Sequence, residues 1–100
     1  MEKYKQSISV FVPAYNEEKN IEKTTKEILN FLENNFRKYE FIIVANVSKD
    51  KTSEISEKLG KKYKNVRVIQ QKKFVGYGTQ LKVGWENSKY ELIFERLRRA

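Results

Sequence analysis

The chain has 100 residues, the length of one domain, and its 39% hydrophobic and 13% aromatic content makes it too apolar to be disordered. It contains no cysteine and no histidine, which excludes disulfides, thiolate or imidazole metal sites and a serine–histidine relay. No apolar run approaches the ~20 residues of a membrane span, and the first six residues do not start a signal peptide. We therefore expect a cytoplasmic location.

The net charge of +8 is compatible with nucleic acid, an anionic membrane surface or a phosphorylated ligand. In residues 17–27, however, lysines alternate with glutamates, which is typical of a solvated helix face. The sequence shows no nucleic-acid-binding motif and no clustered aromatic and basic strand face. We expect no nucleic-acid partner, and peripheral contact with a membrane stays open.

Strands and helices are predicted in strict alternation. Residues 10–12 are an apolar run that Pro13 ends, which indicates a strand buried on both faces. Apolar residues from Ile21 to Phe36 then recur at helical spacing, with Asn16 as the expected cap. The predicted strands are 7–13, 39–45, 66–69 and 90–94. The predicted helices are about 17–36, one from 48–52 to about 65, and about 79–88, with Leu81 and Trp85 expected in the core.

This alternation predicts an α/β fold, a four-stranded mostly parallel sheet with helices on both faces. The two most apolar strand segments, 10–12 and 41–44, should occupy inner positions, which gives the order 3-2-1-4. In such Rossmann-like sheets ligands bind at the carboxyl ends of the strands. The loops to consider are 13–17, 46–50, 70–78 and the residues after Phe94.

Three of these loops resemble family 2 glycosyltransferases, which have the GT-A nucleotide-sugar fold. Residues 10–21, V-F-V-P-A-Y-N-E-E-K-N-I, are similar to the opening of that family. Residues 42–52 correspond to a strand followed by D-D-G-S and a threonine, and residues 75–84 resemble a G-x-G-x-A loop and helix. The closest likeness is to enzymes that transfer sugars to polyprenyl phosphates. The resemblance implies an incomplete GT-A-like domain at 1–94, binding a UDP- or GDP-sugar for hexosyl transfer, with a basic tail at 95–100.

The resemblance and the loop positions together indicate nine residues for binding the nucleotide sugar. Backbone amides at the start of the first helix favour anionic groups, an aromatic ring can face the base, and a glycine pair lets backbone approach phosphates. The alternative is that these residues only cap, turn and pack. The candidates are Pro13, Ala14, Tyr15, Glu17, Asn46, Ser48, Gly76, Gly78 and Lys82.

The second loop departs from the family pattern at three positions. Ala45, Asn46 and Val47 stand where the family has Asp, Asp and Gly. Asn46 keeps a carbonyl acceptor for a base edge but loses the charge that strengthens such a bond. We therefore expect Asn46→Asp with Val47→Gly to tighten UDP binding by about 1 kcal/mol.

The resemblance ends after the fourth strand. There the family has an Asp-x-Asp that holds Mg²⁺ or Mn²⁺, whereas this chain offers Glu95 followed by a basic tail. No catalytic residue is assigned, metal binding is doubtful, and transfer by this chain alone is expected to be weak or absent. The alternative function is a non-catalytic nucleotide-binding or association module. A truncated domain would leave its fourth strand uncovered, so we expect a homodimer.

Overall fold

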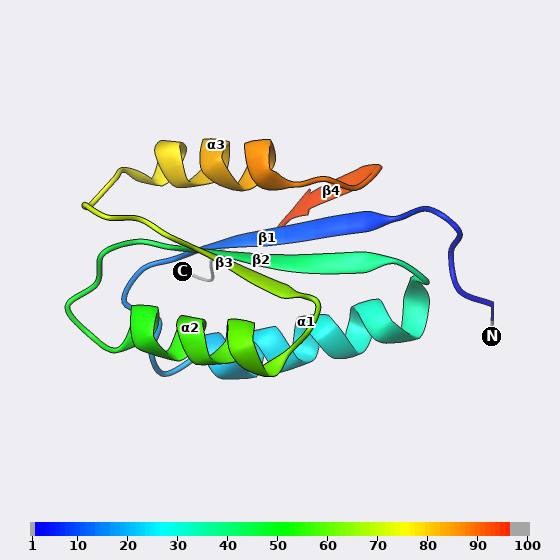
Figure 1. Cartoon of the computed structure of the whole chain (residues 1–100), viewed down its shortest axis with the longest axis horizontal. Coiled ribbons are helices and arrows are strands. Elements are labelled where there is room, and N and C mark those ends of the chain that lie inside the picture. Colours follow the sequence, from blue (N-terminus) through cyan, green and yellow to red (C-terminus); the bar gives the residue numbers. More distant parts are fainter. Residues whose placement is uncertain (1, 97–100) are drawn as a thin grey trace.

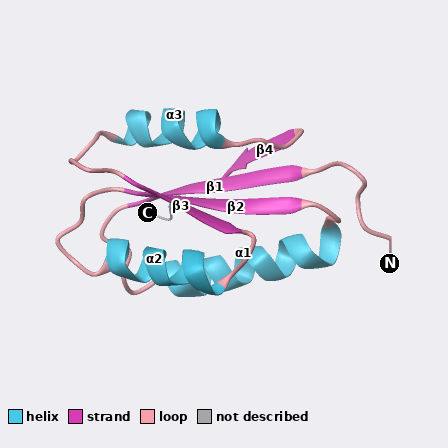
Figure 2. Ribbon diagram, viewed as in Figure 1, coloured by secondary structure: helices cyan, strands magenta, loops and turns pink. Residues whose placement is uncertain are grey.

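The computed structural model describes residues 2–96 and consists of one parallel sheet between two layers of helices. Figure 1 shows the layers, with α1 and α2 on one face of the sheet and α3 on the other, and Figure 2 gives the same view by secondary structure. The elements in chain order are β1 (Ile8–Ala14), α1 (Ile21–Asn35), β2 (Tyr39–Ala45), α2 (Thr52–Lys62), β3 (Val66–Gln70), α3 (Tyr77–Asn87) and β4 (Leu92–Glu95).

The sheet has the order β3-β2-β1-β4, and all three pairs of neighbouring strands are parallel. The predicted fold class and strand order are thus confirmed. β1 and β2 occupy the inner positions because every residue of β1 and six of the seven in β2 are buried, which only an inner strand covered on both faces can achieve. In register, Val10 lies opposite Phe41 on one side and opposite Phe94 on the other.

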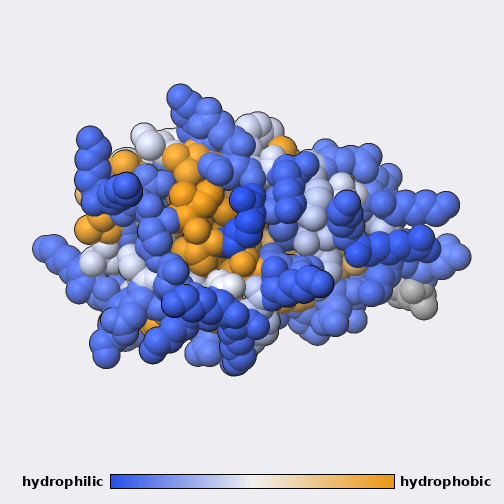
Figure 3. Space-filling model, viewed as in Figure 1, coloured by the Kyte–Doolittle hydropathy of each residue, from blue (hydrophilic) through white to orange (hydrophobic). Residues whose placement is uncertain are grey.

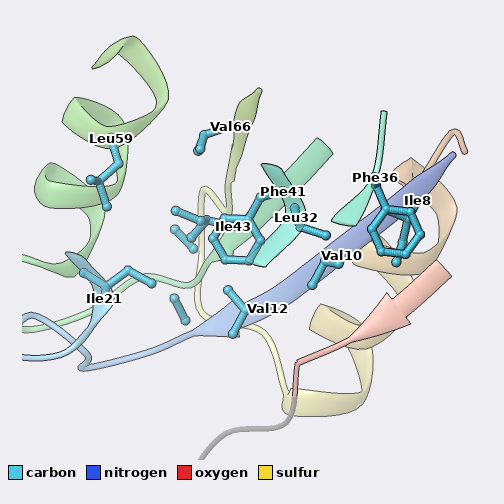
Figure 4. Packing of buried hydrophobic residues seen from close by; sticks show 12 residues of the cluster. Ile8, Val10, Val12, Ile21, Leu32, Phe36, Phe41, Ile43, Leu59 and Val66 are labelled. Carbon is cyan, nitrogen blue, oxygen red and sulfur yellow. The ribbon is translucent and has the colours of Figure 1, made fainter. Parts of the chain in front are cut away.

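The larger part of the core lies between the sheet and the α1–α2 layer. Alternate residues of β1 and β2 point to this face, as the two-residue period of a strand requires. Figure 4 shows them packed against side chains of the two helices, including Ile21, Leu32 and Leu59. All three helix residues are at most 3% exposed, so α1 and α2 are held chiefly by apolar burial.

The smaller part of the core lies under α3, where Phe11, Ile42 and Val44 are fully buried. Gly84 lets α3 approach the sheet closely, because a Cβ at that position would lie 2.1 Å from the Phe11 ring. Trp85, which the sequence placed in the core, is 57% exposed and meets Phe11 edge-on, with the ring centroids 6.4 Å apart. The prediction for Trp85 is therefore wrong, whereas Leu81 packs against this cluster as expected.

Several predicted boundaries shift. α1 begins at Ile21 instead of 17, and Asn16 does not cap it: Asn16 has a φ of 52°, and Asn20 precedes the helix without a side-chain capping bond. α2 ends at Lys62, three residues early, and α3 begins at Tyr77, two residues early. β4 begins at Leu92 instead of 90, because polar side chains of the sheet bind the backbone just before it.

Those polar side chains form a buried network around Glu40, which is 3% exposed. Its carboxylate accepts hydrogen bonds from the Ser9 hydroxyl at 2.5 Å, from Arg67 Nε at 3.0 Å and from the Lys89 amide at 3.0 Å. The Ser9 oxygen in turn accepts the Tyr90 amide. The network joins β1, β2 and β3 to the turn between α3 and β4, at the amino end of the sheet.

Burial acts to raise the pKa of Glu40, but the hydrogen bonds from Ser9 and Lys89 and the nearby Arg67 charge outweigh it. The pKa of Glu40 is therefore below its ordinary value, and the carboxylate is charged at neutral pH.

Ser56 on α2 is completely buried, and its hydroxyl has no hydrogen-bond partner among the described residues. A buried, unsatisfied hydroxyl costs free energy, and alanine also has the better helix propensity. Ser56→Ala is expected to raise the free energy of unfolding by about 1 kcal/mol. Urea denaturation measures this, with Ser53→Ala in the same helix as a control. A destabilised Ser56→Ala protein would show that the hydroxyl has a partner.

The surface in Figure 3 is mostly hydrophilic, with an apolar patch over the sheet between α3 and α2. Within residues 2–96, none of the helices combines the length and apolar character needed to cross a bilayer.

Candidate functional site

The candidate site is the edge of the sheet where β1, β2 and β3 end. The three loops that leave these ends, residues 15–20, 46–51 and 71–76, lie together at the left of Figure 1. Because these strands are parallel, the loops that leave their carboxyl ends lie at the same edge of the sheet. All nine predicted site residues except Lys82 belong to these loops or to the ends of the elements beside them.

The first two loops are fastened together through Asn16 and Ser48. The Asn16 amide donates to Ser48 Oγ at 3.1 Å, and the Lys49 amide donates back to Asn16 Oδ1 at 3.3 Å. Asn16 takes the left-handed backbone conformation, which asparagine tolerates better than most residues. Its side chain therefore joins two loops and does not cap a helix.

Two further amides of the first loop are bound by the second. The Glu17 amide donates to Thr52 Oγ1 at 2.7 Å, and the Glu18 amide donates to Asp50 Oδ2 at 3.2 Å. Burial acts to raise the pKa of Asp50, but the hydrogen bonds from Thr52 and Glu18 outweigh it and hold that pKa below its ordinary value. These amides are engaged within the protein, so the expectation that they bind an anion is wrong.

Asn46 fastens the second loop to the third. Its side chain is 1% exposed, its Nδ2 donates to the Val75 carbonyl at 2.7 Å, and its Oδ1 accepts the Val75 amide at 3.0 Å. The same Oδ1 also accepts the Val47 amide at 3.1 Å. The Asn46 side chain thus links the backbones of two loops, and its Oδ1 already accepts two hydrogen bonds.

This arrangement predicts a stability cost for Asn46→Asp, separate from the expected effect of the double variant on UDP binding. A carboxylate has no N–H for the Val75 carbonyl and would place two acceptors against each other in a buried position. We expect Asn46→Asp to lower the free energy of unfolding by about 1–3 kcal/mol. The same exchange at exposed Asn30 is the matched control, expected to stay within about 0.5 kcal/mol. Equal effects at the two positions would contradict the bridge.

An aromatic residue of the first loop contacts one of the third loop. The ring of Tyr15 is half-buried and meets the ring of Phe74 nearly edge-on, with centroids 5.3 Å apart. Phe74 is 59% exposed, so a large apolar side chain lies in solvent at this edge of the sheet. The sequence missed Phe74, although an aromatic residue between Lys73 and Val75 in a polar loop is itself a signal of contact.

The remaining predicted residues are placed as follows. Pro13 and Ala14 are buried at the end of β1. Gly76 and Gly78 have negative φ, and a Cβ at either would meet nothing within 4 Å, so both border open space. Lys82 is exposed in the second turn of α3.

Gln80, which was not among the predicted residues, also lies at this edge of the sheet. It is 3% exposed, and its amide donates to the carbonyls of Val44 at 3.0 Å and Ala14 at 3.4 Å, where two strands end. Gly76, Gln80 and Gly84 are spaced four residues apart, which places them on one helix face. That spacing is the signal that could have identified Gln80 as facing the sheet.

The metal expected from the family has no suitable donor set within the described residues. No group of three acidic, histidine or cysteine side chains there could hold an ion. Glu95 supplies one carboxylate, and its Oε2 accepts the Tyr77 hydroxyl at 3.1 Å. A divalent cation prefers several oxygen ligands, so the residues at this position do not fit one.

The family of the chain is identified from its sequence. The family model described as glycosyl transferase family 2 matches residues 9–94. The chain belongs to glycosyl transferase family 2. The family expected from the loop motifs is thereby confirmed.

Relatives in this family include dolichyl-phosphate beta-glucosyltransferases. The chain is 36% identical over 91 residues to one from Trichomonas vaginalis, ALG5A, covering 86% of this chain and 28% of the relative. It is 39% identical over 93 residues to the human enzyme, covering 86% and 29%. The expected likeness to the polyprenyl-phosphate branch is confirmed, and the chain spans less than a third of these relatives.

Two solved structures share the fold of this chain. S. aureus TarS 1-349 superposes with a TM-score of 0.69 at 32% identity, covering 90% of this chain and 26% of that one. The mannosyltransferase PcManGT from Pyrobaculum calidifontis, solved with GDP-Man and Mn²⁺, superposes with a TM-score of 0.76 at 22% identity, covering 90% and 26%. The second likeness supports the fold alone.

Proposed function

We propose that the edge of the sheet where β1, β2 and β3 end binds the nucleotide part of a UDP- or GDP-sugar. The observation that carries this proposal is the fastening of three loops into one rim: Asn46 holds the third loop and Ser48 and Thr52 hold the first. A rim fixed before the ligand arrives lowers the ordering cost of binding. Membership of glycosyl transferase family 2 and the likeness to dolichyl-phosphate beta-glucosyltransferases support the ligand class.

Within this site Tyr15 supplies the ring face for the base. Glu17 lies beside it on the same loop and supplies an acceptor for a ribose or base edge. The open backbone at Gly76 and Gly78, at the start of α3, admits the diphosphate, and Lys82 contributes positive charge. Asn46 and Ser48 position the loops and leave direct contact with the base to other residues.

The described residues support binding better than transfer. Glu95 is hydrogen-bonded to Tyr77 and does not fit a divalent cation, so no step of the proposed binding depends on a metal. We expect hexosyl transfer by this chain alone to be weak or absent, in a cytoplasmic setting with peripheral contact to a membrane surface.

Titration calorimetry with UDP, GDP, UDP-glucose and GDP-mannose, each with and without Mn²⁺, tests the proposal. Tyr15→Leu should weaken nucleotide binding by about 1–3 kcal/mol, the contribution of stacking one base on an aromatic ring. Phe31→Leu, on the surface of α1 away from this edge of the sheet, should leave the affinity unchanged. Binding of none of the four ligands at millimolar concentration would reject the proposal.

The second candidate is a non-catalytic module that acts by association. Ala45 and Val47 favour it, because they replace polar and glycine positions of the family loop and leave Val47 43% exposed. Absence of nucleotide binding together with concentration-dependent association would support this candidate instead.

A further inference from the structure

Gln80 carries a buried carboxamide whose two ends have different surroundings. The residue lies in the first turn of α3, and it is 3% exposed. Its Nε2 donates to the carbonyls of Val44 at 3.0 Å and Ala14 at 3.4 Å. Both carbonyls belong to the ends of β1 and β2, so the side chain joins α3 to the two central strands.

The two carbonyls determine which way the carboxamide of Gln80 faces. The NH2 group has two hydrogens, and each carbonyl takes one of them. A half-turn of the amide would place Oε1 against two carbonyl oxygens, which repel it, and would leave both carbonyls without this donor. The NH2 group therefore stays on the strand ends, and Oε1 keeps a fixed position beside it.

The Oε1 atom of Gln80 is open to a donor from outside the protein. Within residues 2–96 no group donates a hydrogen bond to it. It is not sealed in the core either, because Ser56 Oγ is the one side-chain atom of these residues that is both shielded from solvent and without a partner. A largely buried side chain thus presents an acceptor oxygen that a ligand can reach.

This oxygen lies near the residues that border a bound base in the proposed site. Ala14, to which Gln80 donates, directly precedes Tyr15, whose ring is proposed to face the base. The end of β2 continues into Ala45 and Asn46. Ala45 has no hydrogen-bonding side chain, and both polar atoms of the Asn46 side chain are engaged with backbone groups. Gln80 therefore offers the acceptor that these two residues do not.

We propose that Gln80 Oε1 accepts the ring N–H of the base, which makes Gln80 a specificity-determining residue of the nucleotide site. Uracil carries this donor at N3 and guanine carries it at N1, whereas the equivalent ring nitrogen of cytosine and adenine has no hydrogen and repels an acceptor oxygen. Gln80 thus favours uridine and guanosine diphosphates over those of cytidine and adenosine. The inference rests on the proposed nucleotide site at this edge of the sheet.

Methylation of the ring nitrogen removes the donor and keeps the rest of the nucleotide. Titration calorimetry of the full 100-residue chain therefore compares UDP with N3-methyl-UDP, and GDP with N1-methyl-GDP. Methylation should weaken binding to the wild type by roughly ten-fold, the equivalent of one neutral hydrogen bond. Gln80→Met keeps the length and the helix propensity of the side chain but has no amide. In this variant methylation should weaken binding by less than about three-fold.

Gln70→Met is the matched control. The Gln70 Nε2 also donates to a backbone carbonyl, that of Ser53 at 2.9 Å, at the end of β3. Its loss should leave the effect of methylation at the wild-type value. If Gln80 acted only through stability, Gln80→Met would weaken binding of both members of a pair equally, so the ratio of the two affinities separates contact from support.

A measurement on the wild type alone decides the case in which Gln80→Met does not fold. The NMR shift of the Gln80 side-chain carbonyl carbon should change when UDP or GDP binds and stay in place with the methylated analogue. Equal affinity of the wild type for both members of each pair would overturn the inference and leave the nucleotide site standing. An equal effect of methylation in wild type and folded Gln80→Met would do the same. Binding of no nucleotide at millimolar concentration would reject the proposed site, and this inference with it.

Discussion

Glu40→Ala is expected to lower the free energy of unfolding by about 3–5 kcal/mol, a large part of the stability of a domain this size. The change leaves the Ser9 hydroxyl and the Lys89 amide without their buried acceptor, and each unsatisfied group costs about 1–3 kcal/mol. It also removes the partner of Arg67 Nε. Guanidinium denaturation measures the loss, and Glu86→Ala on the exposed face of α3 is the control.

The pH dependence of the free energy of unfolding tests whether Glu40 stabilises the fold through its charge. The pKa of Glu40 is lowered by folding, so its contribution to stability is present above the unfolded value of about 4.3 and is lost as pH falls through the folded pKa. Glu40→Gln should be less stable than wild type at pH 7, and the difference should shrink as pH falls below about 4. A difference that stays constant with pH would contradict a charged, hydrogen-bonded Glu40.

Gly84→Ala is expected to be the second large loss. Its Cβ would lie 2.1 Å from Cδ2 of the buried Phe11 ring, so α3 must move away from the sheet. Overpacking of this kind costs about 1–3 kcal/mol or more. The higher helix propensity of alanine offsets about 1 kcal/mol of this cost. We therefore expect a net loss of about 2 kcal/mol in thermal or urea unfolding.

Gly78→Ala in the same helix is the matched control, because a Cβ there meets nothing within 4 Å. It should leave stability unchanged or raise it by up to about 1 kcal/mol. Phe11→Leu should partly relieve the loss in the Gly84→Ala background, giving a favourable coupling between the two positions. Additive effects would mean that the helix and the ring do not press on each other.

The strand order could be predicted because it follows from burial alone. The apolar runs at 10–12 and 41–44 require cover on both faces, and only inner strands have it. The boundaries of α1 and β4 could not be predicted from the sequence, because hydrogen bonds to residues distant in the sequence determine them. The amides before Ile21 bind side chains from residues 48–52, and those before Leu92 bind Ser9 and Glu40.

The position of the site could be predicted, since parallel strands bring their loops to one edge. The role of Asn46 could not be predicted from its place in a family motif. Its neighbours in sequence give no sign that Val75, 29 residues away, takes both ends of its amide. The partners of the first-loop amides could not be predicted either. By position these amides could bind an anion, but in the structure they donate to the side chains of Thr52 and Asp50.

The most direct test of the central claim is the map of amide NMR shifts when UDP or GDP is titrated into the wild-type chain. The nucleotide should shift amides in residues 15–17, 46–49 and 74–79, which lie at the carboxyl ends of β1, β2 and β3. Amides at the opposite end of the sheet, at 38–40 and 89–91, should stay in place. Shifts confined to that opposite end, or none with either nucleotide at millimolar concentration, would contradict the proposal that the carboxyl ends of β1, β2 and β3 form a nucleotide site.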